Sequence, residues 1–160
     1  MYKITDCLHA PEEVEEMYRR YNFILRDLDS NVQRLDEGPQ VPKYSTCDLI
    51  YSTENNSFCI FRAEPVGVAA DTITLYIYEF YAPNCGYNLL VALFKYLEEQ
   101  NIVANKPRFD IYLEIIDTNT RAKKFWLKYL GKPYLVEKDE YWITRYNFFL
   151  KHNMESENGK

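Results

Sequence analysis

The alternation of hydrophobic and polar positions is clearest over residues 72–81, which read TITLYIYEFY. Ile73, Leu75 and Ile77 fall on one face of this segment, because successive side chains of a strand point to opposite sides of a sheet. The letters ENN after residue 53 indicate a hairpin turn between two strands. Similar runs bounded by turn residues predict strands at 2–6, 47–53, 57–63, 108–116, 133–137 and 140–150.

Apolar residues at helical spacing predict three longer helices. The first follows Pro11, which suits the first position of a helix, and its apolar stripe extends over residues 14–28. Glutamates at its start complement the positive end of the helix dipole. The second helix is predicted over 86–101. The third is predicted over 119–130, where Gly131 fits the C-terminal cap.

These elements follow one another in the order β-α-α-β-β-β-α-β-α-β-β, where the second helix is a short one near Val32 and Leu35. This order is typical of an α+β domain with a mixed sheet. Residues 72–116 form a strand–helix–strand unit, which gives a right-handed crossover if its two strands are parallel. We expect a single domain over residues 1–150, since a chain of this length can bury one core, and a polar, disordered tail over 151–160.

Charge and hydropathy narrow the classes of partner. The chain has a formal net charge of −5 and a pI of about 5.1, which argues against non-specific binding to nucleic acid or to an anionic membrane. The same charge is compatible with a cationic partner such as an amine or a lysine-bearing protein, although solubility alone also accounts for it. No signal peptide pattern opens the chain, and no apolar run reaches the roughly 18 residues that a membrane span needs.

Cysteines and aromatic residues add two further expectations. The four cysteines are scattered without a C-x-x-C pair, and only two histidines accompany them, so we expect no metal site and a reducing cytoplasm. Tyrosine and phenylalanine are frequent, with 15 and 9 residues. They indicate either a core and sheet surface built with tyrosine or an aromatic-walled cleft or interface. The oligomeric state stays open, and the sequence is compatible with a homodimer.

The segment 115–131, IIDTNTRAKKFWLKYLG, resembles the late segment of the GCN5-related N-acetyltransferases. In that family a strand ends in an aliphatic residue, an asparagine follows four positions later, and an alanine follows three positions after that. An aromatic pair and a glycine complete the pattern, usually with one residue fewer between them than in this chain. The matching positions are Ile115, Asn119, Ala122, Phe125, Trp126 and Gly131.

The segment 81–90, YAPNCGYNLL, then falls on the acetyl-CoA loop of the same family, commonly written [Q/R]-x-x-G-x-[G/A]. Gly86 matches its last position, Asn84 replaces the middle glycine, and Tyr81 replaces the Arg or Gln. Asparagine tolerates positive φ better than other non-glycine residues, so we expect Asn84 to hold the turn. The resemblance implies a phosphate cradle of backbone N–H groups at a helix N-terminus. The implied cofactor-binding residues are Phe80, Tyr81, Asn84, Cys85, Gly86, Tyr87, Asn88, Asn119 and Lys123.

The resemblance also implies a fold and an activity. The fold is a splayed, mostly antiparallel mixed sheet of six or seven strands flanked by helices, with acetyl-CoA between the fourth and fifth strands. The activity is acetyl-CoA-dependent N-acetylation of a primary amine, either a small amine or a protein lysine. The N-terminal helices and the loop 36–46 are implied to line the acceptor side, where their acidic residues favour a cationic acceptor. Two alternatives stay open: a non-catalytic protein of this fold that binds a macromolecular partner, and an unrelated α+β module with an accidental match.

Glu79 is the predicted general base. It lies in register with the apolar face of 72–81, where burial is expected to raise the pKa of a carboxyl group toward values that suit proton abstraction. The alternative is a carboxylate at a strand end that reaches solvent. Glu114, on a neighbouring strand, is the second candidate.

The sequence indicates the proton donor to the leaving thiolate less clearly than it indicates the general base. The family's usual Tyr is replaced by Trp126, whose indole N–H is not a useful acid near neutral pH. Tyr129 lies one turn further along the same helical face and can substitute, with core packing as its alternative role. Asn119 is implied to bind the pantetheine arm of the cofactor. A helix N-cap is the alternative role for Asn119, and the two roles are compatible.

Overall fold

The structure, a computed structural model, describes residues 1–28, 41, 46–65, 72–99 and 108–146. The predicted short helix near Val32 and Leu35 and the predicted tail lie outside the described residues. So does the predicted loop 36–46, apart from Val41 and Thr46.

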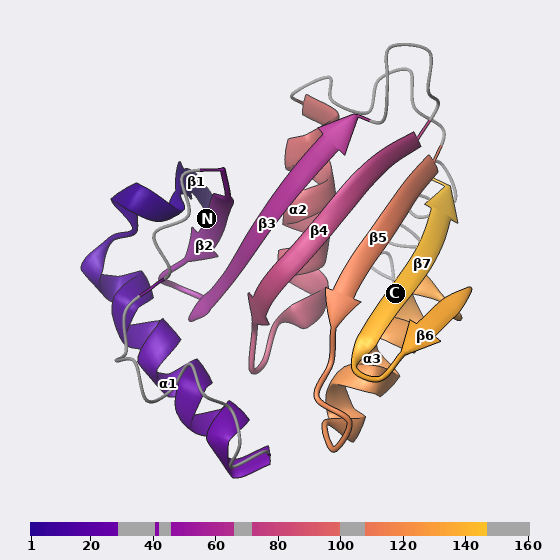
Figure 1. Ribbon diagram of the computed structural model, residues 1–160. Coiled ribbons are helices and arrows are strands. Elements are labelled where there is room, and N and C mark those ends of the chain that lie inside the picture. The colour runs from indigo at the N-terminus through magenta and orange to yellow at the C-terminus, as the bar shows by residue number, and fades with distance from the viewer. Residues whose placement is uncertain (29–40, 42–45, 66–71, 100–107, 147–160) are drawn as a thin grey trace, which may run out of the picture. The chain divides into compact units, whose positions relative to one another are not determined.

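In this part of the chain, seven strands form one mixed sheet in the order β1-β2-β3-β4-β5-β7-β6 (Figure 1). Strand β4 pairs with β5 in parallel, whereas β1–β2, β2–β3, β5–β7 and β6–β7 are antiparallel. This confirms the predicted mixed, mostly antiparallel sheet. The strands are β1 (Lys3–Asp6), β2 (Asp48–Ser52), β3 (Ser57–Pro65), β4 (Thr72–Tyr81), β5 (Arg108–Glu114), β6 (Leu135–Glu137) and β7 (Glu140–Tyr146). The helices are α1 (Glu12–Leu28), α2 (Gly86–Glu99) and α3 (Thr120–Leu130), with a 3₁₀ turn at Cys7–His9.

The chain divides into two compact units. The first comprises Met1–Arg62 and Tyr78–Leu89, and the second comprises Ala63–Ile77 and Leu90–Lys160. Strands β3 and β4 and helix α2 each contribute to both.

The core of the first unit lies between α1 and strands β2 and β3. Helix α1 begins with Glu12, Glu13 and Glu15 in its first turn, where their charges complement the helix dipole, and its apolar stripe is buried. The ring of Phe58 stacks on that of Tyr81 at a centroid distance of 5.7 Å. The cluster also contains Val14, Met17, Tyr18, Leu49 and Ile60.

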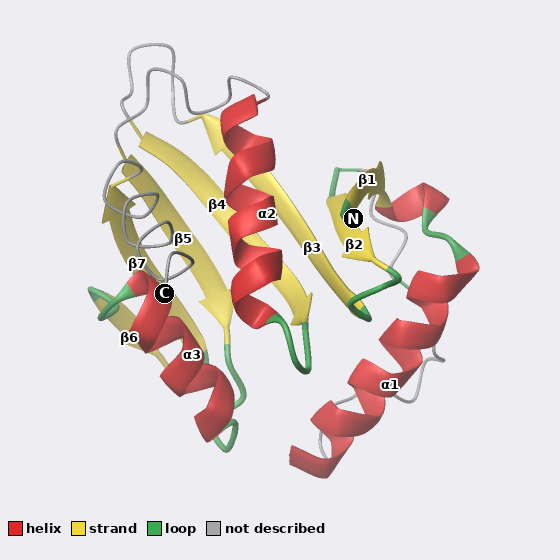
Figure 2. Ribbon diagram, turned by 180° about the vertical axis from the view of Figure 1, so that it is seen from behind, coloured by secondary structure: helices red, strands yellow, loops and turns green. Residues whose placement is uncertain are grey.

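The core of the second unit lies between the sheet and helices α2 and α3, which both cover one face (Figure 2). Phe94 of α2 meets Phe109 of β5 edge to face at 5.0 Å, and Ile111 and Ile143 are buried with them. Gly131 ends α3 with φ of 89°, and its N–H donates to the Leu127 carbonyl. A residue with a Cβ would be strained there, which explains the predicted glycine cap.

Candidate active site

Strand β4 leads directly into α2 through the short turn 82–85. The Leu89 N–H donates to the Cys85 carbonyl at 3.1 Å and begins the hydrogen-bond ladder of α2. The N–H groups of Gly86, Tyr87 and Asn88 precede that bond and lie at the positive end of the helix dipole, which favours an anion. The predicted phosphate cradle thus coincides with a helix N-terminus, and anion binding there stays a prediction.

Asn84 holds this turn differently from the sequence expectation. Among the described residues, only Asn56, Lys138 and Gly131 have positive φ, so Asn84 does not adopt the left-handed conformation that we expected. The turn passes straight into the first turn of α2, and such a connection needs no left-handed residue. Asn84 is therefore not required by backbone strain, and its exposed side chain is open to other roles.

Glu79 lies near the end of β4 and is only 6% exposed. Its neighbours along the strand at Ile73, Leu75 and Ile77 are also buried, as the alternation predicted. Burial raises the pKa of the Cys59 thiol on β3, and the nearby charge of Glu79 raises it further. The carboxylate therefore lies in the interior of the first unit rather than at a solvated strand end.

The alternation of β4 continues through Glu79 to the end of the strand. Every second residue from Ile73 to Tyr81 is buried, and the residues between them are partly buried. Tyr81 belongs to the core cluster of the first unit, and Tyr78 is partly buried against that cluster. The role of the N–H groups near Phe80 and Tyr81 as donors to a ligand carbonyl stays a prediction.

Cys85 contacts the hairpin turn between β2 and β3. Its Sγ donates to the Asn55 carbonyl at 3.3 Å, and the thiol is half-buried. This contact holds the turn 82–85 to the hairpin turn. Cys85 therefore has a positioning role that the sequence did not indicate.

The residues predicted on α3 belong to the second unit. Asn119 Oδ1 accepts a hydrogen bond from the Ala122 N–H at 3.1 Å, so Asn119 is the N-cap of α3. Lys123 Nζ donates to the Asp117 carbonyl and to Asp117 Oδ1, both at 2.7 Å. These bonds raise the pKa of Lys123 and partly neutralise its charge, so Lys123 offers less to a phosphate than its sequence position suggested.

Trp126 and Tyr129 both take part in packing. Trp126 is 6% exposed and lines an apolar cavity of about 180 Å³ together with Ile143. The Tyr129 ring lies 4.9 Å from that of Phe125, and the Lys128 ammonium lies 5.1 Å from its centroid. These contacts agree with the packing role that was one of the two alternatives for Tyr129.

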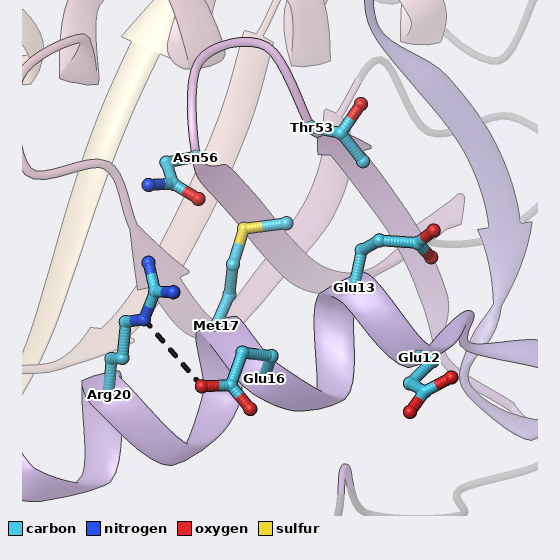
Figure 3. Close-up of a pocket in the computed structure, with 7 residues that line it drawn as sticks. All are labelled: Glu12, Glu13, Glu16, Met17, Arg20, Thr53 and Asn56. Atoms are coloured by element: carbon cyan, nitrogen blue, oxygen red, sulfur yellow. Dashed lines mark ion pairs between the residues drawn. The ribbon is translucent and has the colours of Figure 1, made fainter.

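A second feature of the first unit was missed by the sequence analysis. A cavity of about 380 Å³ opens between the start of α1 and the β2–β3 hairpin, and three glutamates contribute to its lining (Figure 3). The Arg20 guanidinium lies 3.9 Å from the Glu16 carboxylate (Figure 3). The resemblance placed the acidic N-terminal helices on the acceptor side, but it did not predict a cavity against the hairpin, because the proximity of these glutamates to the hairpin is a tertiary contact. The lining residues are Glu12, Glu13, Glu16, Met17, Arg20, Thr53 and Asn56.

No protein-family model matches the chain, and no curated protein matches it in sequence. Solved structures do match along most of its length. The PaiA N-acetyltransferase of Thermoplasma acidophilum, solved with coenzyme A, aligns with a TM-score of 0.59 at 11% identity, covering 91% of this chain and 99% of its own. The chain has a GCN5-related N-acetyltransferase (GNAT) fold.

Two further structures agree with this GNAT fold. A CoA-dependent acyl-homoserine lactone synthase, BjaI, aligns with a TM-score of 0.57 at 11% identity over 97% of this chain and 89% of the synthase. An aminoglycoside acetyltransferase from an uncultured soil metagenomic sample aligns with a TM-score of 0.51 at 12% identity over 86% of this chain and 90% of its own. These matches show the fold over most of the chain.

No helix in the described part of the chain is long and apolar enough to cross a membrane. Within the same residues, no group of three or more His, Cys, Asp and Glu side chains is arranged to hold a metal ion.

Proposed function

We propose that this protein is an acetyl-CoA-dependent N-acetyltransferase that acetylates a primary amine. The observation that carries the proposal is the buried carboxylate of Glu79 at the end of β4, a few residues before the N-terminus of α2. A general base and an anion-binding helix end thus lie on one continuous segment of the first unit. The GNAT fold supports the same chemistry.

The residues present in this segment fit coenzyme A. The N–H groups of Gly86, Tyr87 and Asn88 precede the α2 ladder and suit the pyrophosphate, because a helix N-terminus favours a bound anion. Bound acetyl-CoA would supply the activated acetyl group as a thioester. The roles of Asn119 and Lys123 toward the cofactor stay predictions.

Glu79 has the central role in the proposed reaction. Its ionised carboxylate accepts a proton from the attacking amine, directly or through one water, so that the nitrogen lone pair becomes nucleophilic. The backbone N–H groups near Phe80 and Tyr81 donate to the carbonyl oxygen, where negative charge develops. Tyr129 stays the predicted proton donor to the departing thiolate.

The acceptor is expected to be cationic before it reacts. Three glutamates, Glu12, Glu13 and Glu16, line the cavity between α1 and the β2–β3 hairpin, and Arg20 is the one cationic side chain among the described lining residues. Glu16 also pairs with Arg19, outside that lining, at 2.7 Å. An ammonium group is attracted to such a lining, whereas an anionic acceptor is repelled. The cavity supports an amine acceptor without deciding between a small amine and a protein lysine.

A second candidate function is that of a non-catalytic GNAT-fold protein that binds a macromolecular partner. Trp126 fills the position of the usual proton donor and is buried, and the ring of Tyr81 stacks on Phe58 where the family has an Arg or Gln. Both departures remove a group that the family uses with its cofactor.

Calorimetry with acetyl-CoA and a coupled assay for CoA release test these proposals. We expect micromolar binding of acetyl-CoA and CoA release that depends on an added primary amine from a panel of polyamines, aminoglycosides and lysine peptides. Binding without amine-dependent release from any member favours the non-catalytic function. Absence of acetyl-CoA binding would contradict the proposed acetyltransferase activity.

A further inference from the structure

One face of the sheet in the second unit carries a row of aromatic side chains. Tyr76, Tyr112 and Trp142 are direct cross-strand partners on β4, β5 and β7, so their side chains lie on the same face. Ring centroids are 5.8 Å apart for Tyr76 and Tyr112 and 4.7 Å apart for Tyr112 and Trp142. We call these three residues the aromatic row.

This face points away from the two helices of the second unit. The alternate positions Ile111, Leu113 and Ile143 are buried on the side of α2 and α3, whereas the aromatic row is only partly buried. Figure 1 shows β4, β5 and β7 from the side opposite those helices, and Figure 2 shows the helices in front. Within the second unit, no described helix covers the aromatic row.

A row of carboxylates adjoins the aromatic row on the same face. Glu114 of β5 is the direct partner of Glu140 of β7, and Glu140 is the direct partner of Glu137 of β6. We call these three residues the acidic row. Like charges placed directly opposite each other destabilise a sheet, so this arrangement has a cost that a bound cation would remove.

No Lys or Arg forms an ion pair with Glu114, Glu137 or Glu140 within the part of the chain that is described. The Tyr112 hydroxyl donates to Glu114 Oε1 at 2.9 Å, and Glu140 also lies within its reach. One hydroxyl proton cannot satisfy two carboxylates, so acceptor capacity is left over.

We propose that the aromatic and acidic rows together form a docking surface for an arginine-bearing basic segment of a protein partner. A guanidinium stacks on the face of Trp142 or Tyr112 while its N–H groups bind the adjacent carboxylates. Lysine provides a point charge without the planar fork, so it fits this pair of rows less well. The negative net charge of the chain favours the same kind of partner.

The extent of the surface favours a segment over a single small amine. The two rows run across β4, β5, β7 and β6, a width of roughly 14 Å at about 4.8 Å for each strand spacing. One ammonium group covers only a fraction of that width. The inference concerns binding alone and does not depend on acetyl transfer by the first unit.

The test measures fluorescence anisotropy of a labelled arginine–glycine repeat peptide with the full chain at low salt and without acetyl-CoA. The double variant Glu114→Gln/Glu140→Gln removes two charges at nearly constant shape. Asp27→Asn/Glu99→Gln is the matched control, because it changes net charge equally at two exposed positions elsewhere. A lysine–glycine peptide of equal length tests the choice of cation, and circular dichroism checks that each variant is folded.

We expect the Glu114/Glu140 variant to bind the arginine peptide at least about tenfold more weakly than the wild type, as for loss of charge partners at an interface. The control should change affinity by less than about twofold, and the lysine peptide should bind several-fold more weakly than the arginine peptide. Equal weakening in both double variants would overturn the proposal in favour of net charge alone. Equal affinity for the two peptides, or no saturable binding, would also overturn it.

Discussion

Glu79 is the residue at which the proposed enzyme and the non-catalytic alternative differ most. In the Glu79→Gln variant the side chain keeps its shape but loses its basicity. Binding of acetyl-CoA should therefore survive, while the acetylation rate should fall by about 10²–10⁴-fold at neutral pH. Calorimetry and the CoA-release assay measure the two effects separately.

The control for this variant is Glu99→Gln, an exposed change at the end of α2 that should leave the rate unaltered. Full activity in Glu79→Gln would contradict its role as the base. A loss of the same size in Glu114→Gln alone would instead assign the base to Glu114.

Substitutions of Trp126 test whether the absence of the family's usual tyrosine at this position affects the acetylation rate. Because the indole is 6% exposed, Trp126→Ala should lower the free energy of unfolding by about 3–5 kcal/mol, as for other large-to-small changes in a core. Trp126→Tyr restores the usual proton donor of the family, so the acetylation rate should stay the same or rise. Urea denaturation and the CoA-release assay check these outcomes, and an unchanged stability of Trp126→Ala would contradict the burial of the ring.

At the scale of elements, the junction of β4 and α2 determines the proposed cofactor site. Gly86 is the first residue of α2, and a valine there would place a branched side chain where the pyrophosphate must approach the backbone. Gly86→Val should therefore abolish CoA binding while the fold is retained. Asn84→Gly restores the family's glycine two positions before Gly86, so this variant should bind CoA at least as well as the wild type. Unchanged CoA affinity in Gly86→Val would show that the cofactor site is not in this loop.

The pairing of β5 with β7 predicts how the free energy of unfolding changes at alkaline pH. Burial and the carboxylates of Glu114 and Glu140 raise the pKa of Tyr112, so the folded protein holds this proton more tightly than the unfolded chain does. The resulting stability is complete below the unfolded value of about 10 and is lost as pH rises above it.

Tyr112→Phe removes this group and should make the decline in unfolding free energy between about pH 9 and pH 11 less steep. Urea titrations of both proteins across that range measure the difference, and the other tyrosines contribute equally to both. Identical pH profiles would show that Tyr112 is not the group responsible.

At the scale of the whole molecule, cofactor binding should appear as stability. A ligand that binds only the folded chain raises its unfolding free energy by about 2.7 kcal/mol at a hundredfold excess over Kd. Acetyl-CoA should therefore raise the melting temperature in a concentration-dependent way, and desulfo-CoA should do the same because it keeps the pyrophosphate. An unchanged melting temperature at saturating acetyl-CoA would argue against any native CoA site.

Local patterns determined most of the elements. The period-two alternation of 72–81 gave the strand that the structure contains as β4, and the helical stripe after Pro11 gave α1. Gly131 ends α3 because a positive φ is needed there, and such a requirement is readable at a single position. The resemblance to GCN5-related N-acetyltransferases rested on spacing within two short segments, which is also local.

Only the tertiary structure decided which side chains meet across elements. The acidic row of Glu114, Glu137 and Glu140 exists because β7 lies between β5 and β6 in one particular register, and a shift of one residue would move the row to the opposite face. The cavity beside α1 likewise depends on where the β2–β3 hairpin packs, many residues away in sequence. Periodicity fixes which face of an element is apolar, but register and packing are long-range properties that a local pattern does not contain.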